Sequence, residues 1–315
     1  MNFSRRDLGK IALAAIPCTA AWAAPNSKIS GVQIGVISYS FRDLPAGEIV
    51  PSMTKIGLSE VELMSNHAEA LAGAPPAPGR GGRGQAPTPE MVAAQRALQD
   101  WRSGIKPDAF VAVRKQFNAA GIDIPLLCYN MGVNISDVEI DYAFRMAQAL
   151  GAKAISSSST VSVARRVAPV AEKYKMPWGA HGHDDVKDPE QFATPEIFAN
   201  LLAMGKYMRV NLDIGHFTAA GFDAVSFIRE NHGRITNLHL KDRKKSPPGE
   251  STPIQNNNYP WGEGDTPITQ VLQLLKKEKY NFPANIEYEY GARAKGDPVT
   301  EVARCFEYAK KALQG

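Results

Sequence analysis

The 315-residue chain contains only three cysteines, a small excess of charge and a single short hydrophobic run. Cys18 lies in that run, while Cys128 and Cys305 lie in segments patterned as a strand and a helix, so no disulfide framework is indicated. The 36 lysines and arginines exceed the 32 acidic residues by only 4. This balance is too weak to indicate a nucleic-acid or an anionic membrane partner.

The N-terminus has the three-part layout of a secretory signal. Ser4-Arg5-Arg6-Asp7-Leu8 precedes a short apolar run, and Ala21-Trp22-Ala23 supplies the small residues needed for cleavage. The paired arginines predict a twin-arginine export signal over residues 1–24 and therefore a periplasmic or otherwise exported protein. An uncleaved membrane anchor is the alternative, but the run is shorter than the roughly 20 apolar residues that a span needs.

Beyond the signal, short runs rich in Ile and Val alternate with segments of helical period. The runs are Val32–Ile37, Glu60–Leu63, Ile122–Cys128, Ala152–Ile155, Pro177–Ala180, Met208–Asp213, Ile235–Leu240 and Ala284–Tyr288. The clearest helical segments are Ile140–Leu150, Pro195–Gly205, Asp223–Asn231, Pro267–Glu278 and Pro298–Leu313. Such alternation is typical of parallel βα units.

Eight strand–helix units predict a single-domain α/β protein, a (β/α)₈ TIM barrel over residues 25–315. An open, doubly wound sheet is the alternative. It is disfavoured because the first strand reads GVISYSFRD and lacks the glycine pattern that binds phosphate in such folds. The Pro- and Gly-rich segment 72–89 interrupts the alternation and is predicted to be a disordered loop after the second strand.

Ionisable residues gather where the predicted strands end. A barrel places its active site at these carboxyl ends, and five of the six histidines fall there. In strand order the residues are Glu62, Asn66 and His67, then His181 and His183, then Asp213 and His216, then His239, Lys241 and Asp242, and finally Glu287 and Glu289. The third and fourth strands end in YNM and SSSS, with nothing ionisable.

Each of these features also has a purely structural interpretation. A lone strand histidine is often a core or capping residue, Asp213-x-x-His216 could be a helix cap, and Glu287-x-Glu289 could lie on a solvated edge. A barrel has no free edge, however, and carboxylates buried together repel one another. A divalent cation with neutral imidazoles is the least costly way to hold them. Mixed ligation by two histidines and two carboxylates suits Mn, Co, Zn or Fe(II) better than Mg or Ca.

Four ordered motifs, NLDIGHFTAAGFD, HLKDR, PWGEGDTPI and IEYE, resemble the sugar phosphate isomerase/epimerase branch of the xylose isomerase-like TIM barrels. The resemblance runs from about residue 30 to the C-terminus, apart from the Pro/Gly-rich loop. It implies one divalent metal ion held by side chains at the ends of strands five to eight. The implied ligands are His181, Asp213, His239 and Glu287, and His216 resembles the substrate-binding histidine of the family.

The resemblance also bears on the reaction, because epimerases of the family usually carry glutamate where this chain has His181. A metal-bound neutral imidazole is a poor proton acceptor, which disfavours epimerisation by two bases. One-base isomerisation through an enediolate, or elimination next to a ketone, stays open. The predicted proton-transfer residues are Glu287, Glu289, Glu62 and His183. The predicted substrate-binding residues are His216, Lys241, His67 and Trp261.

Export indicates the kind of sugar, since an exported enzyme meets few sugar phosphates and the chain shows no basic cluster. A free, keto- or glycosylated sugar is therefore the expected substrate, and a keto-glycoside lyase or dehydratase of the same fold is an alternative. An endonuclease IV-like nuclease is a further alternative, which Asp213-x-x-His216 also resembles. It is disfavoured because that relative needs a histidine at the end of the third strand and a glutamate at the end of the fourth, and this chain has neither. A sugar-binding barrel without catalysis is the non-enzyme alternative, and the resemblance leaves open a homo-oligomer.

Overall fold

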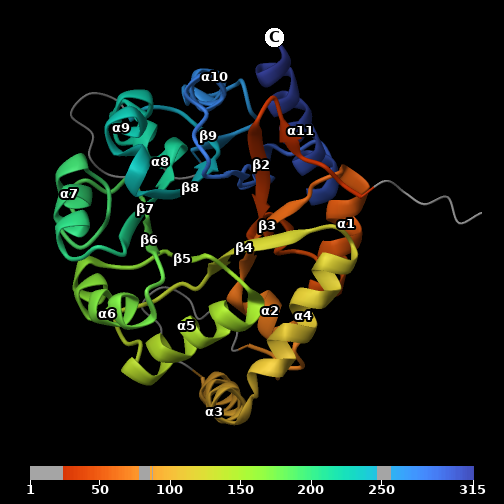
Figure 1. The fold of residues 1–315 in the computed structure, drawn as a ribbon, viewed down its shortest axis with the longest axis vertical. Coiled ribbons are helices and arrows are strands. Elements are labelled where there is room, and N and C mark those ends of the chain that lie inside the picture. Colours follow the sequence, from red (N-terminus) through yellow and green to blue (C-terminus); the bar gives the residue numbers. More distant parts are fainter. Residues whose placement is uncertain (1–23, 78–85, 87, 247–256) are drawn as a thin grey trace, which may run out of the picture.

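A closed barrel of eight parallel strands forms the centre of the protein (Figure 1). The computed structural model describes residues 24–77, 86, 88–246 and 257–315. Neighbouring strands follow the order β2-β11-β8-β7-β6-β5-β4-β3, and β2 pairs with β3 to close the ring. The strands are β2 (Val32–Ile37), β3 (Glu60–Met64), β4 (Asp123–Cys128), β5 (Ala154–Ser157), β6 (Trp178–His181), β7 (Met208–Asp213), β8 (Ile235–Leu240) and β11 (Ala284–Ile286). The predicted single-domain (β/α)₈ barrel is confirmed.

The strand predictions were accurate to one or two residues at each end. Pro177 lies just before β6 rather than in it, because proline has no N–H to donate to a ladder. The last strand ends at Ile286, so Glu287 and Glu289 lie directly beyond it. Three short strands lie outside the ring: β1 (Lys28–Ile29) pairs antiparallel with β2, and β9 (Asp242–Arg243) pairs with β10 (Asn258–Tyr259).

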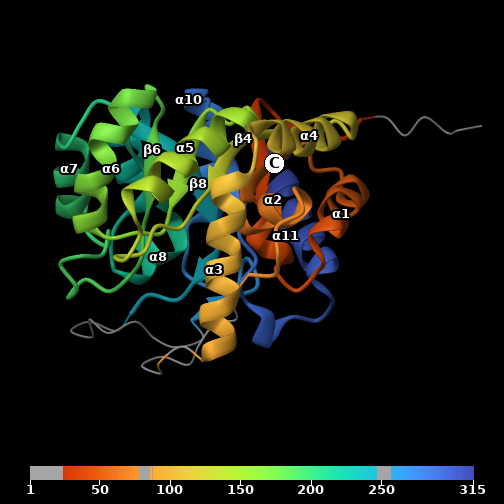
Figure 2. The ribbon, with the colours of Figure 1, turned by 90° about the horizontal axis from the view of Figure 1, so that it is seen from below.

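Helices surround the barrel (Figures 1 and 2). They are α1 (Ile49–Ile56), α2 (Ser65–Leu71), α3 (Pro89–Gly104), α4 (Pro107–Ala119), α5 (Asp137–Leu150), α6 (Val161–Tyr174), α7 (Pro195–Ala203), α8 (Ile214–Ala219), α9 (Ala224–Asn231), α10 (Ile268–Glu278) and α11 (Pro298–Gln314). Local sequence sets their boundaries: Ser136 and Glu139 form a capping box at the start of α5. The five clearest helical segments of the sequence correspond to α5, α7, α9, α10 and α11.

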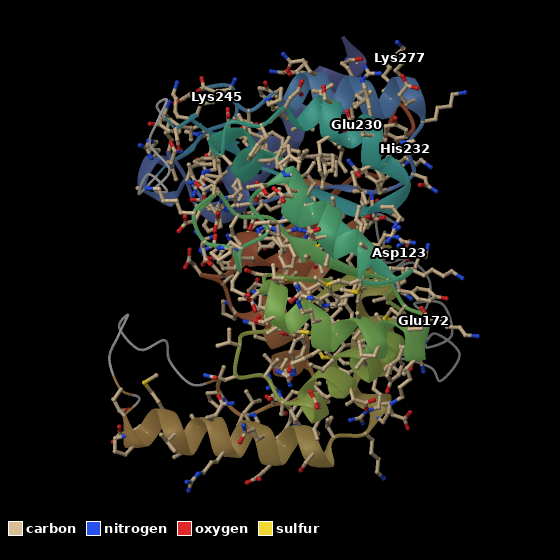
Figure 3. The ribbon with its side chains drawn as sticks, turned by 90° about the vertical axis from the view of Figure 1, so that its left-hand side faces the viewer. Asp123, Glu172, Glu230, His232, Lys245 and Lys277 are labelled. Atoms are coloured by element: carbon tan, nitrogen blue, oxygen red, sulfur yellow. The ribbon has the colours of Figure 1, made fainter. Side chains whose placement is uncertain are left out.

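Three helices rather than one follow β3, and the middle one, α3, stands apart from the barrel wall (Figures 2 and 3). The predicted loop over 72–89 ends where Thr88 caps α3, with its hydroxyl accepting from Met91 N–H at 3.3 Å. Residues 74–77, 86 and 88 have no regular structure, and 78–85 and 87 lie outside the described residues. The predicted signal over 1–24 also lies outside them, apart from Ala24. Across the described part of the chain, no helix is long and apolar enough to cross a membrane.

A largely buried carboxylate, Glu60, is the first residue of β3 and lies at the amino ends of the barrel strands. Burial, with a smaller contribution from the neighbouring Asp123 (Figure 3), raises the pKa of Glu60 to about 7. Its buried Oε1 has no hydrogen-bond partner among the described residues. Because the pKa is higher in the folded chain than in the unfolded chain, the neutral form stabilises the fold at low pH and this stability is lost as pH rises through about 7.

Glu60→Gln is therefore expected to stabilise the protein at pH 8 by about 1 to 3 kcal/mol and to change little at pH 4.5. The amide keeps the shape of the neutral acid and cannot ionise. Thermal melting followed by circular dichroism at the two pH values measures the difference. A gain of the same size at both values would show that ionisation of Glu60 is not its cause.

Candidate metal centre and active-site cavity

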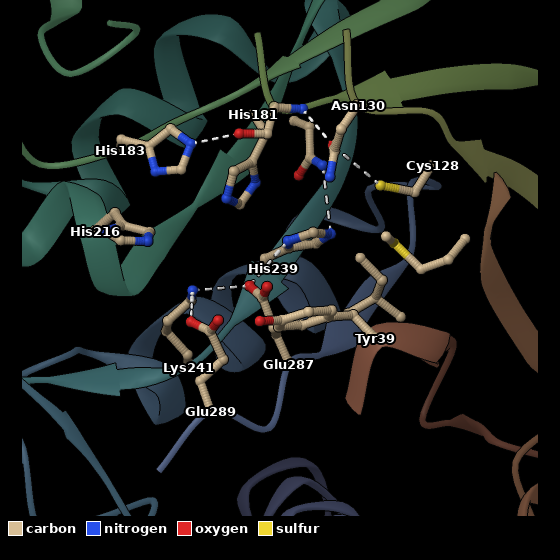
Figure 4. A pocket seen from close by; sticks show the side chains of 14 residues that line it. Tyr39, Cys128, Asn130, His181, His183, His216, His239, Lys241, Glu287 and Glu289 are labelled. Atoms are coloured by element: carbon tan, nitrogen blue, oxygen red, sulfur yellow. Dashed lines mark hydrogen bonds and ion pairs between the residues drawn. The ribbon is translucent and has the colours of Figure 1, made fainter. Parts of the chain in front are cut away.

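A cavity of about 230 Å³ opens at the carboxyl ends of the strands, and every barrel strand contributes to its wall from its last residues or from those just beyond (Figure 4). The structure brings seven of the predicted site residues to this wall: His181, His183, His216, His239, Lys241, Glu287 and Glu289. Residues far apart in the sequence meet here because parallel strands in a closed barrel all end at the same rim.

Four buried side chains at the base of the cavity form a cluster that could hold a metal ion. His181, Asp213, His239 and Glu287 each offer one ligand atom, and these atoms lie within 4.8 Å of one another. Nδ1 of His181 and Oδ2 of Asp213 are buried and make no hydrogen bond with the described residues. Burial, followed by the nearby His239, lowers the pKa of His181 far below its usual value. A neutral imidazole with an unused lone pair suits metal ligation.

Asp213 explains the Asp-x-x-His motif, because its two oxygens have separate roles. Oδ1 accepts a hydrogen bond from the His216 backbone N–H at 2.8 Å and so caps α8. Oδ2 stays in the cluster, 3.0 Å from Nζ of Lys241. Gly215 lies between Asp213 and His216 in the chain. Glycine is required there because a Cβ atom would collide with Lys241. The helix-cap and metal-ligand interpretations of the motif are therefore compatible.

His239 is held between two carboxylates. Its Nε2 lies 2.7 Å from Oε2 of Glu62, and its Nδ1 lies 3.0 Å from Oε2 of Glu287. Burial opposes a charge on this imidazole, but the two glutamates outweigh it and raise the pKa of His239 far above the usual value. Metal binding would displace the proton on Nδ1, the atom directed at the cluster, while Nε2–H continues to donate to Glu62. A ligating histidine commonly donates its other nitrogen to a carboxylate in this way.

Glu62 is the support of this arrangement and is itself completely buried, without lining the cavity. Besides His239, it accepts hydrogen bonds from Asn237 Nδ2 and Asn285 Nδ2, both at 2.8 Å, and from the Ser156 hydroxyl. Gly35 on β2 leaves the room that Asn285 occupies. Glu62 was predicted to be a proton-transfer residue, but the structure places it beneath the cluster, where it positions His239.

Lys241 places a buried ammonium group among three carboxylates. Nζ lies 3.0 Å from Asp213 Oδ2, 3.0 Å from Glu287 Oε2 and 2.6 Å from Glu289 Oε2. Burial alone would lower the pKa of Lys241, but the three carboxylates raise it far above its usual value. For Glu287 the directions are reversed. Burial alone would raise the pKa of this carboxyl group, but Lys241 and His239 lower it well below its usual range. Glu287 is therefore an ionised carboxylate, as a metal ligand must be.

Two further histidines stand on the cavity wall beside the cluster. His183 Nε2 lies 2.6 Å from the Ser158 hydroxyl, and His216 Nδ1 lies 2.8 Å from Asp184 Oδ1. Arg243 forms an ion pair with Asp184 at 3.1 Å, so Asp184 contacts both Arg243 and His216. Burial lowers the pKa of His183 to about 4 and that of His216 far below its usual value. Both rings are therefore neutral near pH 7.

The structure does not bring His67 and Trp261 to the cavity wall. His67 is buried beside it, with Nδ1 2.9 Å from the Ser38 hydroxyl. Trp261 packs edge-on against Tyr308 of α11, with ring centroids 5.8 Å apart. The HLKDR and PWGEGDT motifs are nonetheless linked, because Asp242 accepts backbone hydrogen bonds from Gly262, Gly264 and Thr266 at 2.8 to 3.1 Å. These three hydrogen bonds fix the segment that follows β10 against β9.

Sequence reasoning missed several polar residues of the wall. They are Tyr39, Asn130, Ser158 and Asn211. Tyr39, Asn130 and Ser158 follow strands and Asn211 lies within β7, so strand position was the available signal. None of them is a carboxylate, a histidine, a lysine or an arginine. Asn130 shows how the wall is organised: its Oδ1 accepts from the Ser158 backbone N–H at 2.9 Å and ties the ends of β4 and β5 together.

The donor set of the cluster fits a divalent transition metal. Two imidazoles and two carboxylates suit Mn, Co, Zn or Fe(II) better than the all-oxygen ligation that Mg and Ca prefer. Nδ1 of His181, which is buried and has no hydrogen-bond partner among the described residues, also supports a missing partner. Lys241 partly neutralises the two carboxylates, which accounts for how they tolerate burial side by side.

Solved structures share this fold at low sequence identity. One is a probable 3-DHS dehydratase, AsbF, involved in petrobactin synthesis in Bacillus anthracis, with a TM-score of 0.60, 14% identity and coverage of 90% of this chain and 99% of that one. Another is a sugar phosphate isomerase/epimerase from Parabacteroides distasonis, with a TM-score of 0.56, 14% identity and coverage of 90% of this chain and 95% of that one. A third is the IolI protein with a bound zinc atom, with a TM-score of 0.59, 13% identity and coverage of 90% of this chain and 96% of that one.

At these identities the solved structures establish the fold alone. No curated protein matches the sequence. A family model described as "Xylose isomerase-like TIM barrel" matches residues 90–309, which is more than half of the chain. The barrel, the cluster at its carboxyl rim and this match lead to one conclusion: the chain belongs to the xylose isomerase-like TIM barrel family.

Proposed function

We propose that the protein is a metal-dependent, isomerase-like enzyme that abstracts a proton next to the carbonyl group of a sugar. The observation that carries the proposal is the buried cluster of His181, Asp213, His239 and Glu287, three of which line a cavity at the carboxyl rim. A structural role alone would not explain two buried carboxylates kept beside two buried imidazoles at the place where barrel enzymes act.

The same four residues would hold one divalent ion, with Mn, Co, Zn or Fe favoured over Mg. Such an ion supplies Lewis-acid chemistry that makes the hydrogen next to a carbonyl more acidic. The protein's own part is to hold the ligands rigidly. Glu62 orients His239 through a 2.7 Å hydrogen bond, and the helix cap orients Asp213.

Glu289 is the residue best suited to remove the proton. It lines the cavity, lies outside the four-residue cluster, and its Oε2 is 2.6 Å from Lys241 Nζ. The pKa of His183 is too low for an efficient base, and Glu287 is occupied by the cluster. In the proposed isomerisation Glu289 takes the proton from the carbon next to the carbonyl and returns it to the former carbonyl carbon. The hydroxyl group on the first carbon passes its proton to the former carbonyl oxygen, so that the carbonyl and hydroxyl groups exchange places. Lys241 offers an N–H donor to the sugar oxygen on which negative charge develops.

One proton-transfer carboxylate favours isomerisation or elimination over two-base epimerisation. His181 occupies the position where a second ionised carboxylate would be needed, and its neutral imidazole accepts protons poorly. Elimination next to a ketone is the second candidate, because it also needs only one proton-transfer carboxylate. Glu289, once it holds the proton taken from carbon, passes that proton to the departing hydroxyl or sugar oxygen. The keto-glycoside lyase or dehydratase alternative therefore remains within the proposal.

The charges of the cavity favour a neutral sugar over a sugar phosphate. Among the described residues of the wall, Lys241 is the only lysine or arginine, and three carboxylates surround it. Arg243, close by, is paired with Asp184. A phosphate group would meet no free positive charge here. We extend the proposal to an exported protein that meets free, keto- or glycosylated sugars outside the cytoplasm. A homo-oligomer stays a prediction from the family resemblance.

A substrate screen tests the proposed function. The purified chain is stripped of metal, reloaded with Mn²⁺ and incubated with ketoses, 3-keto-glycosides and sugar phosphates, and the products are separated by chromatography. We expect metal-dependent conversion of at least one neutral sugar. Turnover of sugar phosphates alone would refute the neutral substrate class. Binding of neutral sugars without any conversion would identify a non-catalytic barrel instead.

A further inference from the structure

A second, larger cavity adjoins the first. It measures about 540 Å³ and lies between α3 and the segment that follows β4. Met64 and Asn130 line both cavities, so these two residues lie at the boundary between the two spaces. Figure 3 shows α3 held away from the barrel, which is the arrangement that makes room for this cavity. Nothing in the proposed reaction uses it.

Four of the side chains that line this second cavity are amides. Gln95 and Gln99 are four residues apart on α3 and therefore share one face of the helix. Asn130 and Asn134 line it from the segment after β4. An amide is both a donor and an acceptor and carries no charge, so this lining suits a ligand with several hydroxyl groups.

The single arginine of the lining does not create an anion site. Arg102 donates to Glu69 at 2.7 and 3.0 Å and to Glu139 at 3.1 Å. Two carboxylates thus balance one guanidinium group. A phosphate or carboxylate on the ligand would be repelled rather than bound, which leaves a neutral ligand.

A buried hydroxyl group without a partner also points to a ligand. Tyr129 is only 4% exposed, lines the second cavity and has no hydrogen-bond partner for its hydroxyl among the described residues. Buried hydroxyls are nearly always paired, and an unpaired one at a cavity wall needs a bound water or ligand. At the junction, the Oδ1 atom of Asn130 is engaged by Ser158, so its Nδ2–H₂ group is the one offered to a ligand.

We infer that the second cavity is a subsite for a neutral, hydroxyl-rich ring joined by a glycosidic bond to the sugar in the metal cavity. The inference rests on the proposed function and narrows its substrate class to disaccharide-like glycosides. The reacting ring lies against Lys241 and Glu289, the glycosidic bond passes between Met64 and Asn130, and the second ring lies against Gln95 and Gln99.

Calorimetric titration of the Mn²⁺-loaded chain tests the subsite. The affinities of three disaccharides, trehalose, maltose and cellobiose, are compared with those of the methyl α- and β-glucosides. All five sugars are also used in their 3-keto forms. At least one disaccharide should bind about tenfold more tightly than the methyl glycoside of the same anomer and oxidation state. The double variant Gln95→Ala/Gln99→Ala should lose this advantage and leave methyl glycoside affinity within about twofold. Gln270→Ala, an exposed glutamine on α10, is the matched control.

The outcomes separate the subsite from the proposed function. If methyl glycosides bind or react and no disaccharide binds more tightly, the subsite is refuted and the proposed function stands. An equal loss for both ligand classes in the double variant would also refute it, since α3 would then act only through structure. If no sugar of either class binds or reacts, the proposed function fails and the subsite fails with it.

Discussion

Glu287→Gln is expected to weaken Mn²⁺ binding by at least about 100-fold and to lower turnover by about 1,000-fold or more. Glu287 supplies a carboxylate to the four-residue cluster, and its Oε2 also lies 3.0 Å from both His239 Nδ1 and Lys241 Nζ. The amide keeps the size of the side chain but removes the negative charge that a divalent ion requires. Metal analysis of the dialysed protein and calorimetric titration with Mn²⁺ measure the first effect without any knowledge of the substrate.

Glu289→Gln is the matched control for this experiment. Glu289 lies two residues further along the chain and contacts the same lysine, but it is outside the four-residue cluster. We expect this variant to retain Mn²⁺ within a few-fold of the wild type and to lose turnover, because it removes the proposed base. Equal loss of metal in both variants would show that the cluster is wrongly defined. Full activity of Glu289→Gln would exclude it as the base.

Glu62→Ala is expected to destabilise the protein by about 3 to 5 kcal/mol and to lower its melting temperature by roughly 10 °C. The substitution leaves the buried donors of Ser156, Asn237 and Asn285 without their acceptor, and each such loss costs about 1 to 3 kcal/mol before relaxation. It also frees His239 from the hydrogen bond that sets its orientation. Chemical denaturation and thermal melting of the metal-free protein measure the change.

Glu62→Gln separates the hydrogen bonds from the charge. The amide oxygen can still accept from the donors that now reach Oε2, while the negative charge beside His239 is lost. We expect a much smaller loss of stability than in Glu62→Ala, together with Mn²⁺ binding that is about 10-fold to 100-fold weaker. Wild-type stability of Glu62→Ala would contradict the supporting role. Wild-type metal affinity of Glu62→Gln would show that the charge does not act through His239.

The barrel was predictable because its signals are local. Short runs such as Met208–Asp213 have the length and composition of strands, and the segments between them carry helical period and caps. The three helices after β3 were not foreseen, since α3 is amphipathic only weakly and follows a Pro/Gly-rich segment. Its placement away from the barrel depends on tertiary contacts such as the Arg102–Glu69 ion pair, which no local pattern encodes.

The candidate site was predictable in outline for a geometric reason. Once eight parallel strands close into a barrel, all their carboxyl ends share one rim, so His181, Asp213, His239 and Glu287 had to lie near one another. The resemblance to a known family added their roles as ligands. Sequence position could not separate Glu62 from Glu289, because both follow the same rule of lying at a strand end.

Strand periodicity and strand order are properties of the chain, so they specify the barrel, the rim where ionisable residues gather and the residues eligible to hold a metal ion. Which of these residues face the cavity depends on how the strands and helices pack. The tertiary structure turned Glu62 beneath the cluster to hold His239, set Lys241 among three carboxylates, and packed Trp261 against α11. The reason is physical: burial and pairing of a charge depend on which side chains from distant strands meet it, and these meetings exist only in the folded barrel.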